Sequence, residues 1–145
     1  MMPTIQNLVV IFTSCWALAG AEMLIYPTAI GGVPTDPEWE QNQQLQAWQL
    51  VQRGHAVANG LPVVTANRTG VEPDPTGRST GINFWGHSFI TGAQGELLTE
   101  FEKAEEGARV VDLDLEQCEY VRRGWPFLRD RRIDAYEDLL KRYRK

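Results

Sequence analysis

The chain has 145 residues, of which 43% are hydrophobic and 23% are charged, and its formal net charge is −5. These values are typical of one globular domain with a core, and five Trp, five Phe and four Tyr exclude extensive disorder. Two cysteines are too few for a disulfide framework, so we expect a reducing compartment and a cytoplasmic protein.

The apolar stretch Leu8–Ala21 is the first predicted element, and residues 14–21 are predicted to end a helix near Gly20. The stretch is similar to the hydrophobic part of a signal peptide, but Arg53 is the first basic residue of the chain. A secretory signal normally begins with positive charge. The run is also short for a membrane-spanning helix, and Glu22 ends it. We therefore expect neither export nor a membrane partner.

A buried strand is predicted at Glu22–Ala29, and a long helix follows it. Asp36 is predicted as the N-cap of this helix, with Pro37 at the first helical position. Gly60 is predicted to end it. Residues at helical spacing predict one buried face, formed by Leu45, Trp48, Val51 and His55.

The next strand is predicted at Leu61–Thr69, and residues 71–81 are predicted to form a polar loop rich in turn residues. Residues 82–102 alternate as two strands around Gly92–Gly95, which is typical of a hairpin.

A further strand is predicted at Ala108–Leu115, followed by a short helix at Glu116–Arg123. Ala135–Tyr143 could form another helix near the C-terminus. This order predicts an α/β fold in which helices cover one face of a mixed sheet. The apolar character of the strands indicates that the other face requires a second layer.

The two cysteines are candidate nucleophiles. A reactive thiol needs a nearby cation, a base or a helix N-terminus. Cys15 lies late in an apolar helix with none of these nearby in the sequence, so we interpret it as a buried, inert residue. Cys118 lies among the acids Glu116 and Glu119, which disfavour a thiolate, and it is also predicted to be inert.

The stretch GHSFI at Gly86–Ile90 is similar to the hydrolase nucleophile elbow G-x-S-x-G, but its fifth position is isoleucine. It also has the pattern of a strand, and a nucleophile elbow is a turn from a strand into a helix. In a strand, His87 and Ser88 would point to opposite faces. No hydrolase elbow is therefore predicted.

A metal centre is not predicted either. Asp112 and Asp114 share one face of their predicted strand, but no histidine lies near them in the sequence. His55 and His87 are the only histidines, and His55 is expected to be a hydrogen-bonded core residue. The residues alone therefore predict no catalytic residue, metal or cofactor.

The charge is distributed unevenly. Residues 122–145 contain nine Lys and Arg against four Asp and Glu, so this tail carries +5 and the remaining chain carries −10. A basic tail can bind nucleic acid. The acidic body favours the other interpretation, in which the tail lies along its own body or along a partner subunit.

Several stretches between about Ala17 and the C-terminus carry a family resemblance: ALAGAEMLIYPTAIG, QRGHAVANGLPVVTANRTG, EPDPTG, FWGHSFITGAQGELL, VVDLDLEQCEYVRRGWPFLRDRRIDAY and LLKRY. Together they resemble the C-terminal half of the N-carbamoylputrescine amidases, a branch of the carbon–nitrogen hydrolase (nitrilase) superfamily. This resemblance implies an α-β-β-α sandwich in which two sheets stack face to face.

The chain would then be a partial carbon–nitrogen hydrolase domain over residues 1–145. Residues 1–15 do not match, residues 16–121 would form part of the sandwich, and residues 122–145 would be an assembly tail. The resemblance implies a homo-oligomer that pairs through outer helices and this tail, with no nucleic-acid partner.

The resemblance also implies an activity, the hydrolysis of N-carbamoylputrescine to putrescine, carbon dioxide and ammonia in polyamine synthesis. The family uses a Glu base, a Lys that stabilises the oxyanion and a Cys nucleophile that forms a thioester-type intermediate. Glu and Lys belong to the other half of the family chain, and the Cys motif aligns near Thr4, where nothing matches. We therefore expect a truncated or frameshifted gene product that is inactive alone and has no catalytic residues.

Four residues are carried over from the family as pocket-lining and substrate-binding candidates: Tyr26, Pro27, Thr28 and Ala29. The small-molecule substrate would be a carbamoyl amine. Two alternatives remain open, namely another N-carbamoyl or amide hydrolase of the superfamily, and a non-catalytic fragment that assembles with intact subunits.

Overall fold

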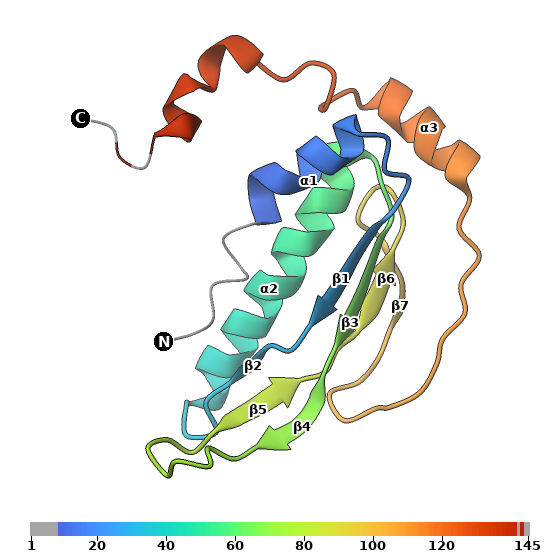
Figure 1. The fold of residues 1–145 in the computed structure, drawn as a ribbon. Helices are drawn as coiled ribbons and strands as arrows, with labels where there is room; N and C mark the ends of the chain where they lie inside the picture. The colour runs from blue at the N-terminus through green and yellow to red at the C-terminus, as the bar shows by residue number, and fades with distance from the viewer. Residues whose placement is uncertain (1–8, 142, 144–145) are drawn as a thin grey trace.

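A computed structural model describes residues 9–141 and 143 (Figure 1). Helices α1 (Val9–Leu18) and α2 (Glu38–Asn59) pack against each other and lie on one side of a four-stranded sheet. Helix α3 (Leu115–Gly124) lies beyond the end of α1, and the tail continues past it. None of the helices in the described ranges is long and apolar enough to cross a bilayer. The mixed α/β class predicted from the sequence is confirmed.

The four-stranded sheet has the order β1-β3-β6-β7. Strand β1 (Leu24–Thr28) runs parallel to β3 (Val63–Asn67), with Thr28 opposite Asn67. Strands β6 (Phe89–Thr91) and β7 (Leu97–Glu100) are antiparallel neighbours joined through Gly92–Gly95, which confirms the predicted hairpin.

A second, three-stranded sheet has the order β2-β5-β4. It consists of β2 (Gly31–Gly32), β5 (Ile82–Trp85) and β4 (Thr69–Glu72), all antiparallel. Strand β2 approaches β5 very closely, since a Cβ on Gly31 would lie 2.2 Å from the carbonyl oxygen of Asn83. Only glycine permits this contact.

The core lies between α2 and the four-stranded sheet. Alternate residues of the strands point toward the helix, and Phe89, which is 1% exposed, packs edge-on against Trp48 of α2 with ring centroids 5.9 Å apart. Thr65 donates a hydrogen bond to Gln52 Oε1 at 2.6 Å. The buried members of this cluster are Ala17, Leu24, Trp48, Ala56, Leu61, Val63, Trp85 and Phe89.

The opposite face of the same sheet remains open at β1 and β3. Ile25 is 66% exposed, and Pro27 and Ala66 are also exposed. Among the described residues this face of the four-stranded sheet therefore has no covering layer, whereas the sandwich expectation places a second sheet against it.

Two details of α2 differ from the sequence prediction. Pro37, with φ −56° and ψ 144°, occupies the N-cap position, so the prediction of Asp36 as N-cap was wrong by one residue. Asp36 instead accepts a hydrogen bond at its carbonyl from Gln41 Nε2 at 2.9 Å. Val51 is 43% exposed, because the buried stripe follows Trp48, Gln52 and His55. The predicted stop at Gly60 is confirmed, with φ +60°.

The predicted strand at Ala108–Leu115 is not formed. Val110 is 94% exposed, and residues 108–114 run without a partner strand among the described residues. A strand requires an edge to pair with, and this segment meets none, so its alternating pattern alone does not make it a strand. Helix α3 follows almost where it was predicted, and Asp114 caps it by accepting a hydrogen bond from the Gln117 amide at 2.9 Å.

Three other expectations need correction. The two strands predicted across residues 82–102 are three strands in two sheets, because the chain turns at Gly86 and His87, where φ is +66° and +51°. Strand β4 includes Val71 and Glu72, which were assigned to the loop. The tail contains 3-10 helices at Ile133–Ala135 and Glu137–Leu140 rather than an α-helix over residues 135–141.

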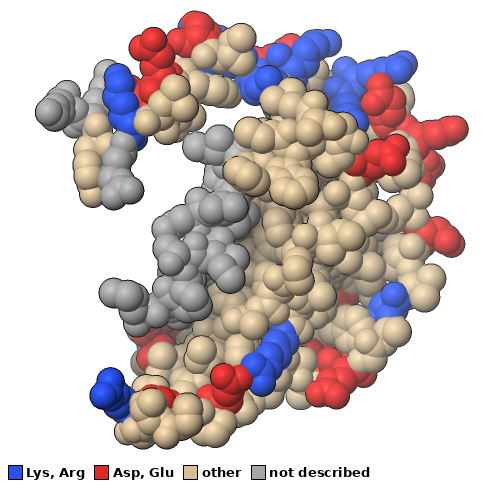
Figure 2. All heavy atoms as spheres, viewed as in Figure 1, with Lys and Arg blue, Asp and Glu red and all other residues tan. Residues whose placement is uncertain are grey.

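Lys and Arg gather along α3 and the tail at the top of Figure 2, with acidic residues among them. Several of these charges are paired locally. Arg129 contacts Asp130 at 2.6 Å, and Lys141 contacts Asp138 at 3.0 Å. The positive charge of the tail is therefore partly compensated within the tail itself.

Candidate functional site

The candidate site lies where the parallel strands β1 and β3 end. Carboxyl ends of parallel strands meet at one edge of a sheet, and this edge is a common position for ligand sites. The register of the β1–β3 pair places Thr28 beside Asn67 at this edge. In the sequence Asn67 lies within QRGHAVANGLPVVTANRTG, one of the stretches that carry the family resemblance, and its side chain bonds several segments at this edge.

The Asn67 side chain uses all of its hydrogen-bonding capacity. Its Oδ1 accepts from Thr28 Oγ1 at 3.1 Å and from the Ile30 amide at 2.9 Å. Its Nδ2 donates to the carbonyls of Ile30 at 3.1 Å and Gly86 at 2.9 Å. Its backbone amide donates to Ser88 Oγ at 2.9 Å. Asn67 thus joins the end of β1, the turn after β5 and the start of β6 into one rigid edge.

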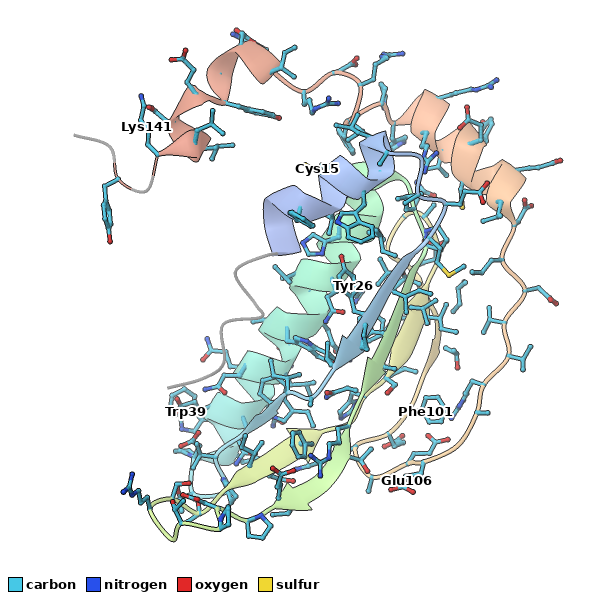
Figure 3. All side chains as sticks on the ribbon, viewed as in Figure 1. Cys15, Tyr26, Trp39, Phe101, Glu106 and Lys141 are labelled. Atoms are coloured by element: carbon cyan, nitrogen blue, oxygen red, sulfur yellow. The ribbon has the colours of Figure 1, made fainter. Side chains whose placement is uncertain are left out.

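A cavity of about 450 Å³ opens beside this edge. Its lining comes from the end of β3, the start of β6 and the segment that leaves β7 (Figure 3). The lining residues are Ala66, Asn67, Arg68, Thr69, Ser88, Phe101, Glu105, Glu106 and Gly107.

Two of the three charges in this lining are paired. The Arg68 guanidinium forms an ion pair with Glu72 and lies 4.5 Å from the centroid of the Phe84 ring. Glu105 contacts Arg109 at 2.5 Å. The Glu102 amide and then the Arg109 guanidinium hold the pKa of the Glu105 carboxyl below its usual value.

The four candidate residues carried over from the family lie around this edge, but none is among the lining residues. Tyr26 points toward α2, where its hydroxyl lies 3.1 Å from His55 Nδ1. Pro27 pairs with Ala66, which does line the cavity. Thr28 is bonded to Asn67, and Ala29 is exposed in the connection between β1 and β2.

The other candidates lie apart from the cavity. Cys15 is exposed on α1, so the expectation that it is buried was wrong (Figure 3). Cys118 is buried, and burial raises the pKa of its thiol. His55 is a hydrogen-bonded core histidine as predicted. Thr4, where the family cysteine motif aligns, lies outside the described residues.

Two hydroxyl side chains, those of Ser88 and Thr69, line the cavity. Ser88, directly before β6, accepts a hydrogen bond at its Oγ from the Asn67 amide and donates one to the Asn67 carbonyl, and the Thr69 hydroxyl lies 3.4 Å from Glu106. Among the described residues, no group of three or more His, Cys, Asp and Glu could hold a metal ion.

A family model for carbon-nitrogen hydrolases matches residues 12–123. The chain belongs to the carbon–nitrogen hydrolase family. It is 43% identical over 125 residues to N-carbamoylputrescine amidase of Oryza sativa subsp. japonica, an alignment that covers 85% of this chain and 40% of that protein. It is 35% identical to the citrullinase of Francisella tularensis, covering 88% of this chain and 42% of that protein.

A solved carbon-nitrogen hydrolase from Helicobacter pylori G27 is 52% identical with a TM-score of 0.84, covering 91% of this chain and 45% of that one. An amidase from Nesterenkonia is 26% identical with a TM-score of 0.61. The family assignment and the fold agree with the resemblance seen in the sequence. The chain spans less than half the length of these relatives.

No motif in the sequence identifies Glu105, Glu106 and Phe101 as site residues. They belong to a segment without a motif, and only the tertiary fold brings residues 101–107 against the end of β3.

Proposed function

We propose that this chain supplies the substrate-binding edge of an amidohydrolase that converts N-carbamoylputrescine and water into putrescine, carbon dioxide and ammonia. The observation that carries this proposal is the 43% identity to N-carbamoylputrescine amidase, which runs across the whole candidate edge. The ordered Asn67 network and the adjoining cavity support it, because they provide a rigid, preformed place for a small molecule.

The described residues that line the cavity include neither a cysteine nor a lysine. We therefore propose that hydrolysis requires the Glu and Lys that the resemblance assigns to the other half of the relatives, together with the Cys of the motif that aligns near Thr4, where this chain does not match. Loss of a nucleophile and its partners costs many orders of magnitude in rate, so the chain alone is expected to be inactive.

Coexpression tests this proposal. The chain is produced together with the residues of the Helicobacter pylori hydrolase that it does not cover, and ammonia release from N-carbamoylputrescine is measured. Activity in the mixture but in neither part alone supports the proposal. A mixture that forms a complex, shown by copurification, but releases no ammonia from any carbamoyl compound contradicts it.

Hydrolysis of a related carbamoyl compound is the second candidate function. The chain is also 35% identical to a citrullinase and 27% identical to a beta-ureidopropionase. The same assay with citrulline and 3-ureidopropionate separates these possibilities, and the proposal requires N-carbamoylputrescine to give the highest kcat/KM.

We further propose that the chain assembles with a second subunit through its tail. Leu140 is 91% exposed and Ile133 is 71% exposed, and a stretch of apolar side chains left in water is typical of an interaction surface. Light scattering on the full chain and on a chain ending at residue 124 tests this. The full chain should be oligomeric and the shortened chain monomeric.

A further inference from the structure

We infer that Glu106 selects substrates with a cationic end by binding their ammonium group in the cavity beside Asn67. This inference rests on the proposed function and deepens it, because it names the part of the substrate that the site distinguishes. N-carbamoylputrescine ends in an ammonium group, whereas 3-ureidopropionate ends in a carboxylate.

The charged side chains that line the cavity favour a cationic ligand. Its lining contains one cation, Arg68, and two carboxylates, Glu105 and Glu106. Arg68 is paired with Glu72, and Glu105 is paired with Arg109. Within the described part of the chain, Glu106 has no ion-pair partner, and its contact is the Thr69 hydroxyl at 3.4 Å. The cavity therefore presents one uncompensated negative charge.

The surroundings of Glu106 suit an alkylamine. Thr69 can turn its oxygen toward an ammonium that Glu106 binds, and an ammonium has three donors to satisfy. Ala66 and Phe101, one face of which is covered by the Arg109 guanidinium at 4.7 Å from the ring centroid, provide apolar surface for the methylene groups that follow the ammonium. Figure 3 shows Phe101 and Glu106 on the same segment below β7.

The same charges disfavour a ligand that carries a carboxylate. A carboxylate would need Arg68, but that guanidinium is held both by Glu72 and by the face of the Phe84 ring. It would also approach the uncompensated charge of Glu106, and like charges at short range repel. The cavity should therefore bind amines in preference to acids of the same length.

The test uses the full chain and ligands without a carbamoyl group, so it does not depend on hydrolysis. Butylamine and butyrate are titrated into ¹⁵N-labelled protein while the amide signals of Thr69, Phe101 and Gly107 are followed. Butylamine should shift these signals and butyrate should not. The affinity for butylamine should fall as salt is added, since Glu106 is exposed.

Two variants locate the charge that is responsible. Glu106→Gln should weaken butylamine binding by up to about fivefold, the upper size expected for one exposed ion pair. Glu102→Gln removes the same charge from the same segment, but Glu102 does not line the cavity, so this control should bind like the unmodified chain.

Equal binding by the Glu106→Gln variant and the unmodified chain overturns the inference, as does equal or better binding of butyrate. Absence of any shift with butylamine also overturns it. None of these results bears on whether the assembled enzyme hydrolyses carbamoyl compounds, which the coexpression assay measures separately.

Discussion

The hydroxyl of Tyr26 lies 3.1 Å from Nδ1 of His55, which joins β1 to α2 inside the core. Burial raises the pKa of Tyr26 to about 12, so this hydroxyl is protonated at neutral pH and donates to His55. Neutral His55 therefore carries its proton on Nε2, a buried atom that has no partner among the described residues. Tyr26 faces the helix layer and acts as a link between layers rather than as a lining residue of the cavity.

The Tyr26–His55 pair predicts that the free energy of unfolding of the chain falls in mild acid. Burial lowers the pKa of His55 below its ordinary value of 6.5, so the unfolded chain binds a proton more readily than the folded chain. The stabilisation is complete above pH 6.5 and is lost as the pH falls from 6.5 toward the folded pKa. Urea unfolding at several pH values should show this loss.

His55→Gln is the variant that isolates the histidine. The carboxylates of the chain titrate in both proteins, so the difference between their pH profiles belongs to His55. The variant should lose less stability than the unmodified chain between neutral pH and about pH 5. Parallel profiles would show that His55 does not titrate differently on folding.

Asn67→Ala should destabilise the site edge strongly. It removes four side-chain hydrogen bonds and leaves the Ile30 amide and the Gly86 carbonyl without this partner. We expect a loss of about 3 kcal/mol in unfolding free energy, since each unsatisfied buried group costs about 1–3 kcal/mol. Amide exchange should show that Ile30 loses its protection.

Two further variants make the Asn67 test specific. Asn67→Asp retains the acceptor but places a carboxylate oxygen against the carbonyls of Ile30 and Gly86, so it should be at least as destabilising as alanine. Asn42→Ala, at an exposed position of α2, should change stability by less than about 0.5 kcal/mol. A similar small change for Asn67→Ala would contradict the role assigned to this residue.

Gly60 and Arg122 should be coupled. Gly60 has φ +60°, and a Cβ there would lie 2.6 Å from Arg122 Cγ. Gly60→Ala therefore incurs both the left-handed backbone cost of about 1 kcal/mol and a collision with the arginine. In an Arg122→Ala background only the backbone cost remains.

A double-mutant cycle on unfolding free energies measures this coupling. The double variant should be more stable than the sum of the two single changes predicts, because the second substitution removes the collision. Additive effects would show that the Arg122 side chain moves aside at no cost. Arg122→Ala by itself should loosen α3, because Arg122 donates to the carbonyls of Asn59 and Ala21, each at 3.3 Å.

The two thiols should differ in reactivity. Cys15 is exposed on α1, whereas Cys118 is buried and burial raises the pKa of its thiol. Ellman's reagent should therefore modify one thiol rapidly in the folded chain and both after unfolding. Cys15→Ser should abolish the rapid phase and Cys118→Ser should retain it. A rapid phase that survives in Cys15→Ser would place the reactive thiol at Cys118.

Patterns that depend on neighbours in the sequence predicted much of this fold. The stop of α2 at Gly60, the strands beginning near Leu24 and Val63, and the hairpin at Gly92–Gly95 all follow from local turn chemistry and apolar runs. Local spacing wrongly predicted a strand around Val110, because a strand also requires the edge of another strand to pair with. It could not reveal the turn at His87, because a φ of +51° is uncommon for any residue other than glycine.

The site was harder to predict than the fold. The resemblance indicated the end of β1, and Thr28 does lie at the edge that Asn67 organises. Glu106 and Phe101 reach the same cavity from a segment more than thirty positions away from Asn67. Nothing in their own spacing relates them to it, so only the folded chain shows that they belong together.

The close approach at Gly31 has a consequence for how related sequences are interpreted. A side chain at this position would overlap the backbone of β5, so substitutions there would be eliminated although the position has no chemical role. In a mutational scan, Gly31 would therefore show the intolerance that is usually taken as a mark of an active site. Space between two backbones, and not contact with substrate, would be the cause.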